Sequence, residues 1–176
     1  MKKASTLCLG IFILCINILA QNKMHDKQFT ESFTQDSCTF QTTGRNSFFI
    51  LEPGYQLVFE GTEDKNKTTL IITVLNDIKR IGNVETRVVE ENESVNGKTI
   101  EISRNFFAFC KQTSSIFYFG ENVDMYNNGK IISHEGAWSA EGKNKPGVVM
   151  PGIILSGSRF YQKVAPGMAM DRSEII

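Results

Sequence analysis

The stretch IFYFGENVDMYNNGKIISHEGAW, residues 116–138, decides the fold. Apolar residues recur on both sides of Asn128-Gly129. This dipeptide between such runs is the strongest short signal for a β-hairpin, because both turn positions require a positive φ. The stretch therefore predicts two antiparallel strands, at residues 116–126 and 130–138, joined by a two-residue turn.

The segments before this hairpin follow the same plan. Runs rich in β-branched and aromatic residues are separated by turn sequences such as Asn96-Gly97, and they occupy residues 55–60, 68–75, 84–91 and 98–111. No segment has a sustained helical period of apolar residues. Strands joined by short turns form an antiparallel meander, which must curl or close to cover its apolar face. We therefore predict an all-β domain: a strongly curved sheet or a β-barrel, complete or incomplete.

The C-terminal third has a looser pattern. Pro146-Gly147, Pro151-Gly152 and Pro166-Gly167 interrupt it, and only one short strand is expected there, at Arg159–Val164. Neither an internal repeat nor a second domain is apparent. The predicted organisation is a single antiparallel β domain at residues 38–176.

The first twenty residues are typical of a secretory signal peptide. Lys2 and Lys3 are followed by a nearly uncharged apolar run that ends at Leu19-Ala20. We predict cleavage after Ala20, a polar leader at residues 21–37, and a protein exported to the periplasm or beyond. The alternative is a retained membrane anchor, although a run of about 17 residues is at the lower limit for spanning a bilayer.

Cleavage would leave two cysteines, Cys38 and Cys110. In an oxidising compartment an isolated pair is more often bonded than free, so we predict a disulfide between them. The alternative is two buried thiols, since Cys110 follows the apolar run Phe106-Phe107-Ala108-Phe109.

Charge and composition exclude several kinds of partner. Nineteen Lys and Arg residues balance nineteen Asp and Glu residues, so the basic excess of a nucleic-acid-binding surface is missing. With only His25 and His134, a histidine-rich metal site is not expected. We predict no metal, no cofactor, no nucleic acid partner and no stable membrane span after signal cleavage.

The predicted hairpin places particular side chains on one face. A two-residue turn at Asn128-Gly129 pairs Asn127 with Lys130 and, counting outward, Met125 with Ile132, Val123 with His134, Glu121 with Gly136 and Phe119 with Trp138. Because side chains alternate along a strand, the mostly apolar set should point inward. Its members are Phe119, Glu121, Val123, Met125, Ile132, His134 and Trp138.

Glu121 and His134 would then lie diagonally across the strand pair among aromatic rings. A carboxylate and an imidazole in an apolar setting perturb each other's pKa values, which makes the pair a candidate site. The alternatives are a structural hydrogen bond, or a β-bulge at Gly120 that turns Glu121 outward. The candidate ligand-binding residues are Phe119, Glu121, Met125, His134 and Trp138; the candidate catalytic residues, for an acid–base reaction, are Glu121 and His134.

Several longer motifs carry a resemblance. They are Ser103-Arg104-Asn105-Phe106-Phe107-Ala108, Phe117-Tyr118-Phe119-Gly120-Glu121 with Val123-Asp124, Glu135-Gly136-Ala137-Trp138, Met150-Pro151-Gly152, Tyr161-Gln162, and Ala165-Pro166-Gly167 with Ala169-Met170-Asp171-Arg172. Together they resemble a family of uncharacterised secreted bacterial proteins with an all-β fold. The resemblance implies no established activity and no catalytic residue. It also implies further strands after Asp171-Arg172, so that this chain would be a shortened member.

Three functions are compatible with these patterns. The favoured one is a non-enzymatic exported domain that binds a small apolar or amphipathic ligand, or a partner, on an aromatic-lined inner face. The second is an exported hydrolase that uses Glu121 and His134 as acid and base. The third is a structural protein of the cell envelope.

Overall fold

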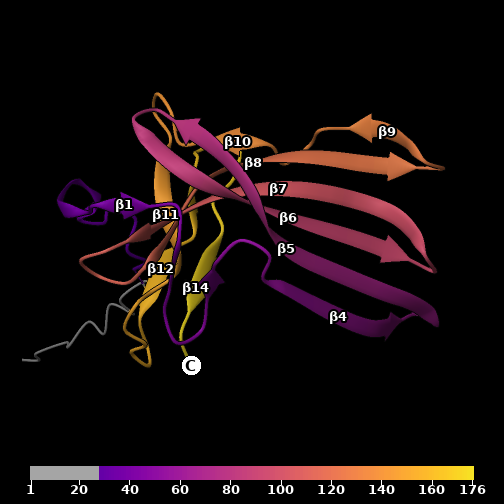
Figure 1. The fold of residues 1–176 in the computed structure, drawn as a ribbon, viewed down its shortest axis with the longest axis horizontal. Coiled ribbons are helices and arrows are strands. Elements are labelled where there is room, and N and C mark those ends of the chain that lie inside the picture. Colours follow the sequence, from indigo (N-terminus) through magenta and orange to yellow (C-terminus); the bar gives the residue numbers. More distant parts are fainter. Residues whose placement is uncertain (1–27) are drawn as a thin grey trace, which may run out of the picture.

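One antiparallel meander dominates the computed structural model, which describes residues 28–176. The sheet curls through 223° as an open half-barrel (Figure 1), so the predicted all-β curved sheet is confirmed and its barrel remains open. The predicted signal peptide and residues 21–27 of the polar leader lie outside the described residues.

Five long strands form the meander and follow one another both in the sequence and across the sheet. They are β4 (Gln56–Glu63), β5 (Asn66–Ile81), β6 (Val84–Val95), β7 (Lys98–Cys110) and β8 (Ile116–Asn127). Their far ends project together as an arm (Figure 1). These five strands overlap the runs predicted from the sequence, and β5 extends well beyond the predicted residues 68–75.

Shorter strands complete the structure. On the β8 side of the sheet, β11 (Lys145–Met150) and then β13 (Lys163–Val164) are added. Further strands pair with β7 or β8: β1 (Phe40–Gln41), β9 (Lys130–Ser133) and β10 (Trp138–Ser139). Two small separate sheets consist of β2 (Gly44–Arg45) with β3 (Ile50–Leu51), and β12 (Arg159–Tyr161) with β14 (Arg172–Glu174). The 3-10 helix η1 (Gln35–Ser37) precedes β1.

The Asn128-Gly129 turn is as predicted, but the register beyond it is not. Both turn residues have positive φ values, 50° and 74°, and Asn127 pairs with Lys130. A register irregularity follows at once, so Met125 pairs with Ser133 and not with Ile132. The predicted strand 130–138 is also broken into β9 and β10, because the chain turns between them at residues 134–137.

A second irregularity changes the faces of β8. Phe106 pairs with Gly120 and Phe107 with Tyr118, which leaves Phe119 without a partner on β7 as the extra residue of a β-bulge. Gly120 has a φ of 146°, and a Cβ atom there would lie 2.5 Å from the carbonyl oxygen of Trp138. Only glycine fits this position without a shift of backbone.

Alternation places neighbouring aromatic residues of β8 in two cores on opposite faces of the sheet, and the bulge puts Phe119 on the face opposite to Glu121. Tyr118 packs with Phe107 and Trp138 in one core, whereas Phe119 packs with Phe117 in the other. In the second core the Phe119 ring meets the ring of Phe40 edge-on, with centroids 5.2 Å apart.

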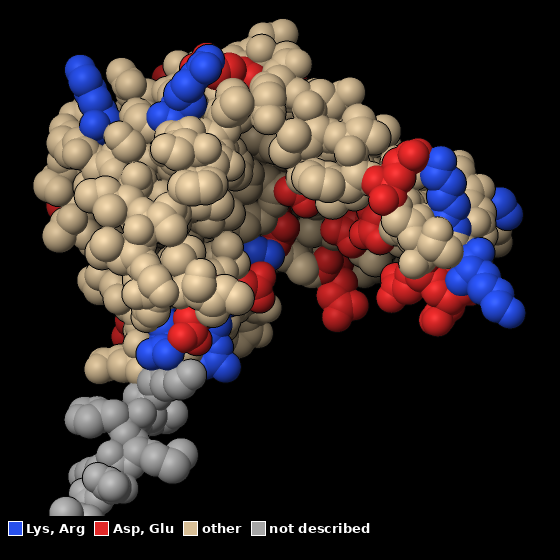
Figure 2. Space-filling view, turned by 90° about the horizontal axis from the view of Figure 1, so that it is seen from below, with Lys and Arg blue, Asp and Glu red and all other residues tan. Residues whose placement is uncertain are grey.

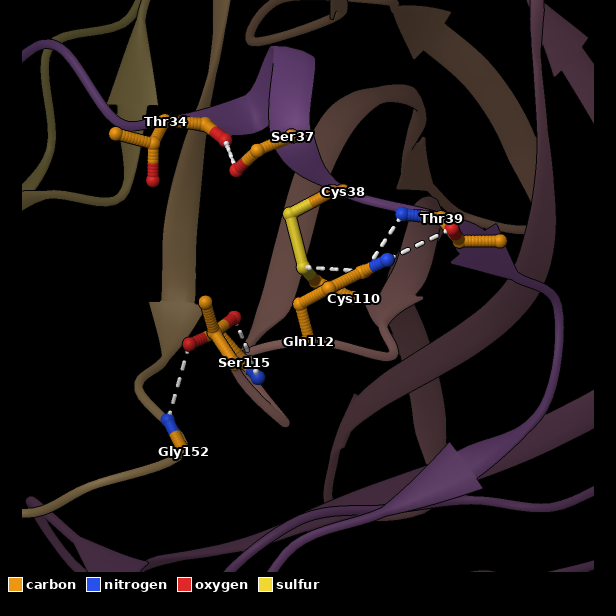
Figure 3. The surroundings of a disulfide bond; sticks show 9 residues. Thr34, Ser37, Cys38, Thr39, Cys110, Gln112, Ser115 and Gly152 are labelled. Atoms are coloured by element: carbon orange, nitrogen blue, oxygen red, sulfur yellow. Dashed lines mark hydrogen bonds between the residues drawn. A yellow bond between two sulfur atoms is a disulfide. The ribbon is translucent and has the colours of Figure 1, made fainter.

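The predicted disulfide joins the N-terminal part of the domain to β7. The sulfur atoms of Cys38 and Cys110 are 2.05 Å apart, and Phe40 of β1 pairs with Cys110. Figure 3 shows Gln112 beside the bond, where its side chain accepts a hydrogen bond from the Thr39 backbone at 2.7 Å and donates one to the Thr39 hydroxyl at 2.8 Å. The disulfide and these bonds hold Cys38 and Thr39 against the end of β7.

Within residues 28–176, the structure contains no helix of the length and apolarity needed to cross a membrane.

Candidate ligand-binding face

Three transverse rows of side chains define the face of the sheet that lies inside the curl, called here the inner face. Residues directly opposite each other in an antiparallel sheet point to the same side, so the pairing registers identify the rows. The first runs across β4 to β8 as Leu57, Ile72, Glu91, Ser103 and Val123. The second is Phe59, Leu70, Glu93, Glu101 and Met125. The third runs from β5 to β10 as Val74, Val89, Asn105, Glu121 and Trp138.

The rows divide the inner face into an apolar part on β4 and β5 and a part on β6 to β8 that carries its polar and acidic residues together with Val89, Val123 and Met125. An apolar hollow of about 130 Å³ occupies the first part. It is lined by Phe48, Phe49, Ile50, Tyr55, Leu57, Ile72, Val74, Val89, Glu91, Phe107 and Val149. Glu91 is the only acidic residue among these, and it belongs to both parts of the face.

Four carboxylates form the acidic cluster of the inner face: Glu91, Glu93, Glu101 and Glu121. Glu93 and Glu101 are direct cross-strand partners. Burial raises the pKa of Glu91, and the charges of Glu121 and Glu101 raise it further. Burial likewise raises the pKa of Glu101, with the charges of Glu93 and Glu121 adding to the effect. The carboxylates therefore repel one another across three strands.

Lys163 of β13 supplies the counter-charge at one end of the cluster. Its Nζ lies 2.8 Å from Glu121 Oε1 and 2.9 Å from Asp171 Oδ2. Burial lowers the pKa of Lys163, but the hydrogen bonds to these two carboxylates and their negative charges together outweigh burial and raise it overall. Because β13 is separated from β8 by β11 in the sheet, this contact crosses one intervening strand.

Tyr118 and Asn105 complete the polar network around Glu121. The Tyr118 hydroxyl donates to Glu121 Oε2 at 2.8 Å and also contacts Asn105 Oδ1. Burial, with the neighbouring charge of Glu121, raises the pKa of Tyr118 far above its usual range, so this hydroxyl stays protonated. The side chain of Glu121 is thus fully engaged, and the residue is only 7% exposed.

Glu91, Glu93 and Glu101 differ from Glu121 in having no such partners. Within residues 28–176, none of the three forms an ion pair or a side-chain hydrogen bond. All three are half-buried. Figure 2 shows acidic side chains gathered along the hollowed side of the molecule beneath the arm. No ion pair therefore compensates these charges, and the charge of Lys163 offsets only part of the rise in the pKa values of Glu91 and Glu101.

The structure brings some of the predicted site residues together and separates others. Glu121, Met125 and Trp138 lie on the inner face, in its second and third rows. The prediction that Phe119 shares their face is wrong, because the bulge at Gly120 turns its ring into the opposite core. Glu121 also pairs with Trp138, and not with Gly136 as predicted.

His134 does not meet Glu121. Its Nδ1 lies 2.9 Å from the Val123 carbonyl oxygen and 2.9 Å from Asp124 Oδ1. The register slip after the turn carries His134 beyond the strand pair, and its side chain is 68% exposed. Asp124 also accepts from Arg104, whose Nε lies 3.1 Å from Glu90. The two predicted acid–base residues thus belong to separate networks.

The sequence reading missed the carboxylates of β6 and β7. Alternation in Glu91 and Glu93, and in Glu101, Ser103 and Asn105, places these polar residues on the face that is apolar elsewhere. That signal was available but contradicts the usual rule that the apolar side of a strand points inward. No comparable pattern pointed to Lys163, because the sequence of the C-terminal segment does not predict how its strands pair.

No group of three or more His, Cys, Asp or Glu side chains in residues 28–176 has the arrangement to hold a metal ion.

The fold and face define an open antiparallel half-barrel with an inner surface that is apolar at one side and acidic at the other. Neither a family model, nor a curated protein, nor a solved structure matches the chain.

Proposed function

We propose that this protein is an exported, non-enzymatic binding domain that holds the apolar part of an amphipathic ligand on the inner face of its half-barrel. The observation that carries the proposal is the apolar hollow bordered by Glu91. An apolar concavity with a few polar groups at its rim is the usual form of a small-molecule site.

The exposed apolar residues next to the hollow support the same function. Leu57 is 38% exposed and Phe59 52% exposed, and both lie on the inner face of β4. Burial of apolar surface contributes roughly 25 cal/mol per Å². A ligand that covered these side chains would gain binding energy that the free protein leaves unused.

The hydrolase alternative has less support. Glu121 is held by Lys163 and Tyr118, whereas His134 contacts Asp124. An acid–base pair has to act on one substrate, and these two groups have no common neighbour among their contacts. The structural alternative predicts that changes to the inner face leave every binding measurement unchanged.

Export fits the disulfide between Cys38 and Cys110, because such bonds persist in oxidising compartments. Cell fractionation of the full chain, with mass measurement of the mature protein, tests it. Export predicts a mature form beginning near Gln21. A full-length protein in the cytoplasm would contradict that part of the proposal.

The binding function is tested by calorimetric titration of the purified protein with dodecyl maltoside below its micelle concentration. We expect saturable binding that Leu57→Gln weakens roughly three- to ten-fold, since it removes apolar surface from the edge of the hollow. Val58→Gln is the matched control, because Val58 lies next to Leu57 on the opposite face and is 57% exposed. Absence of binding, or equal loss in both variants, would refute the proposal.

A further inference from the structure

We infer that the ligand of the inner face is a basic amphipathic peptide, whose apolar side chains cover β4 and β5 while its positive side chains meet the acidic cluster. This inference rests on the proposed function and names the chemistry of the ligand.

The first argument is charge complementarity. Glu91, Glu93 and Glu101 have no ion-pair partner among the described residues, and each is held near other carboxylates. Like charges placed directly opposite each other destabilise a sheet, so this arrangement costs the free protein stability. A cation bound between Glu93 and Glu101 would convert that repulsion into attraction.

The second argument is extent. Glu91 and Glu93 lie in the first and second rows, two residues apart on β6, which corresponds to roughly 7 Å at about 3.3 Å per residue. Glu101 lies opposite Glu93 on the neighbouring strand β7. Three carboxylates without ion-pair partners exceed the charge of a single ammonium group. A chain with several positive charges can match them.

The third argument is the side-by-side placement of the two surfaces. In the first row Leu57 and Ile72 are followed directly by Glu91, and in the second row Phe59 and Leu70 are followed by Glu93. A ligand lying along these strands meets apolar groups on one side and carboxylates on the other. Peptides with segregated apolar and basic residues have that pattern.

The test compares three peptides of different charge with two surfactants. The probes are labelled peptides of alternating leucine and lysine, leucine and serine, or leucine and glutamate, together with dodecyltrimethylammonium and dodecyl maltoside. Binding to the purified protein is followed by anisotropy of the labelled peptides and by fluorescence of Trp138, the one tryptophan of the chain. We expect the lysine peptide to bind about ten-fold more tightly than the serine peptide, with an affinity that falls as salt is added.

Two triple variants identify the contact. Glu91→Gln, Glu93→Gln and Glu101→Gln together should remove the preference for the lysine peptide. Glu31→Gln, Glu85→Gln and Glu135→Gln make the same change in net charge at exposed positions and should leave the preference intact. Thermal unfolding confirms that both variants fold. The salt dependence of lysine-peptide binding to the unaltered protein measures the contribution of charge independently of these variants.

The outcomes separate the inference from the proposed function. Equal affinity for the lysine and serine peptides, or an undiminished preference in the first triple variant, would overturn the inference while dodecyl maltoside binding still supports the function. If dodecyltrimethylammonium binds as tightly as the lysine peptide, a single cation on an alkyl chain is a sufficient ligand, and the inference of a peptide is overturned. If no probe binds, dodecyl maltoside included, the proposed function fails as well.

Discussion

Glu93 on β6 lies directly opposite Glu101 on β7, on the inner face of the curled sheet. Neither carboxylate forms an ion pair within residues 28–176, and the charge of Glu93 contributes to the raised pKa of Glu101. A pair of this kind stabilises nothing in the free protein. We therefore connect this pair of carboxylates with ligand binding.

Replacing one member of this pair should stabilise the free protein. Glu93→Gln removes a like-charge contact between neighbouring strands, and we expect the free energy of unfolding to rise by about 0.2–1 kcal/mol at neutral pH. Chemical denaturation measures this change. Glu85→Gln, an exposed site elsewhere on β6, should change stability less. A loss of stability in Glu93→Gln would show that the carboxylate has a favourable partner.

The acidic cluster should also make stability depend on pH. The pKa values of Glu91 and Glu101 in the folded protein are raised from 4.5, so between 4.5 and the raised values the folded state binds more protons than the unfolded state. The free energy of unfolding contributed by these groups must therefore rise as pH falls through that window. Below it, both states are protonated and the contribution is constant.

The measurement is denaturation of the protein and of the Glu91→Gln, Glu101→Gln double variant from neutral pH to about pH 4.5. We expect the free energy of unfolding of the unaltered protein to rise relative to that of the variant as pH falls. A difference between the two that stays constant, or moves in the other direction, would contradict the raised pKa values.

Lys163 should be important for stability because it neutralises Glu121. Lys163→Met leaves a buried carboxylate without its counter-charge, and we expect a loss of about 3–5 kcal/mol. Adding Glu121→Met should recover much of that loss. Lys145→Met, on an exposed site of the neighbouring β11, is the control and should be nearly neutral. Equal stability of the Lys163→Met and control variants would show that the ion pair contributes little.

Gly120 should tolerate no side chain. In Gly120→Ala the new Cβ would lie 2.5 Å from the Trp138 carbonyl oxygen at a φ of 146°, so we expect a loss of about 1–3 kcal/mol. Gly129→Ala, at a turn with nothing within 4 Å of the new atom, carries the positive-φ strain without the contact and should cost less. The melting temperatures of the two variants are compared. Equal losses of stability would mean that β10 can move away from the new methyl group at position 120.

Much of the fold could be predicted from the sequence, because its signals are local. Asn128-Gly129 and Asn96-Gly97 specify turns through their positive φ values, and the apolar runs between the turns specify strands. The disulfide followed from the count of cysteines that remain after the predicted cleavage. These features depend on residues close together in the chain or on simple counting.

The site was harder to predict, because it depends on register. One bulge at Gly120 moved Phe119 to the other core, and one slip after the Asn128-Gly129 turn carried His134 away from Glu121. A single extra residue reverses the face of everything beyond it. The partner that Glu121 does have, Lys163, is 42 residues away, and the two come together because β13 pairs with β11, which pairs with β8.

The central claim is that the inner face binds the apolar part of a ligand, and methyl NMR of the leucine, isoleucine and valine side chains during a dodecyl maltoside titration tests it most directly. We predict saturable shifts at Leu57, Leu70 and Ile72, which lie around the hollow or beside it on the inner face. Ile78, Ile132 and Ile153 are exposed and line no part of the hollow, so their signals should not move. Shifts spread over these exposed residues, or no shift at Leu57 and Ile72, would contradict the account.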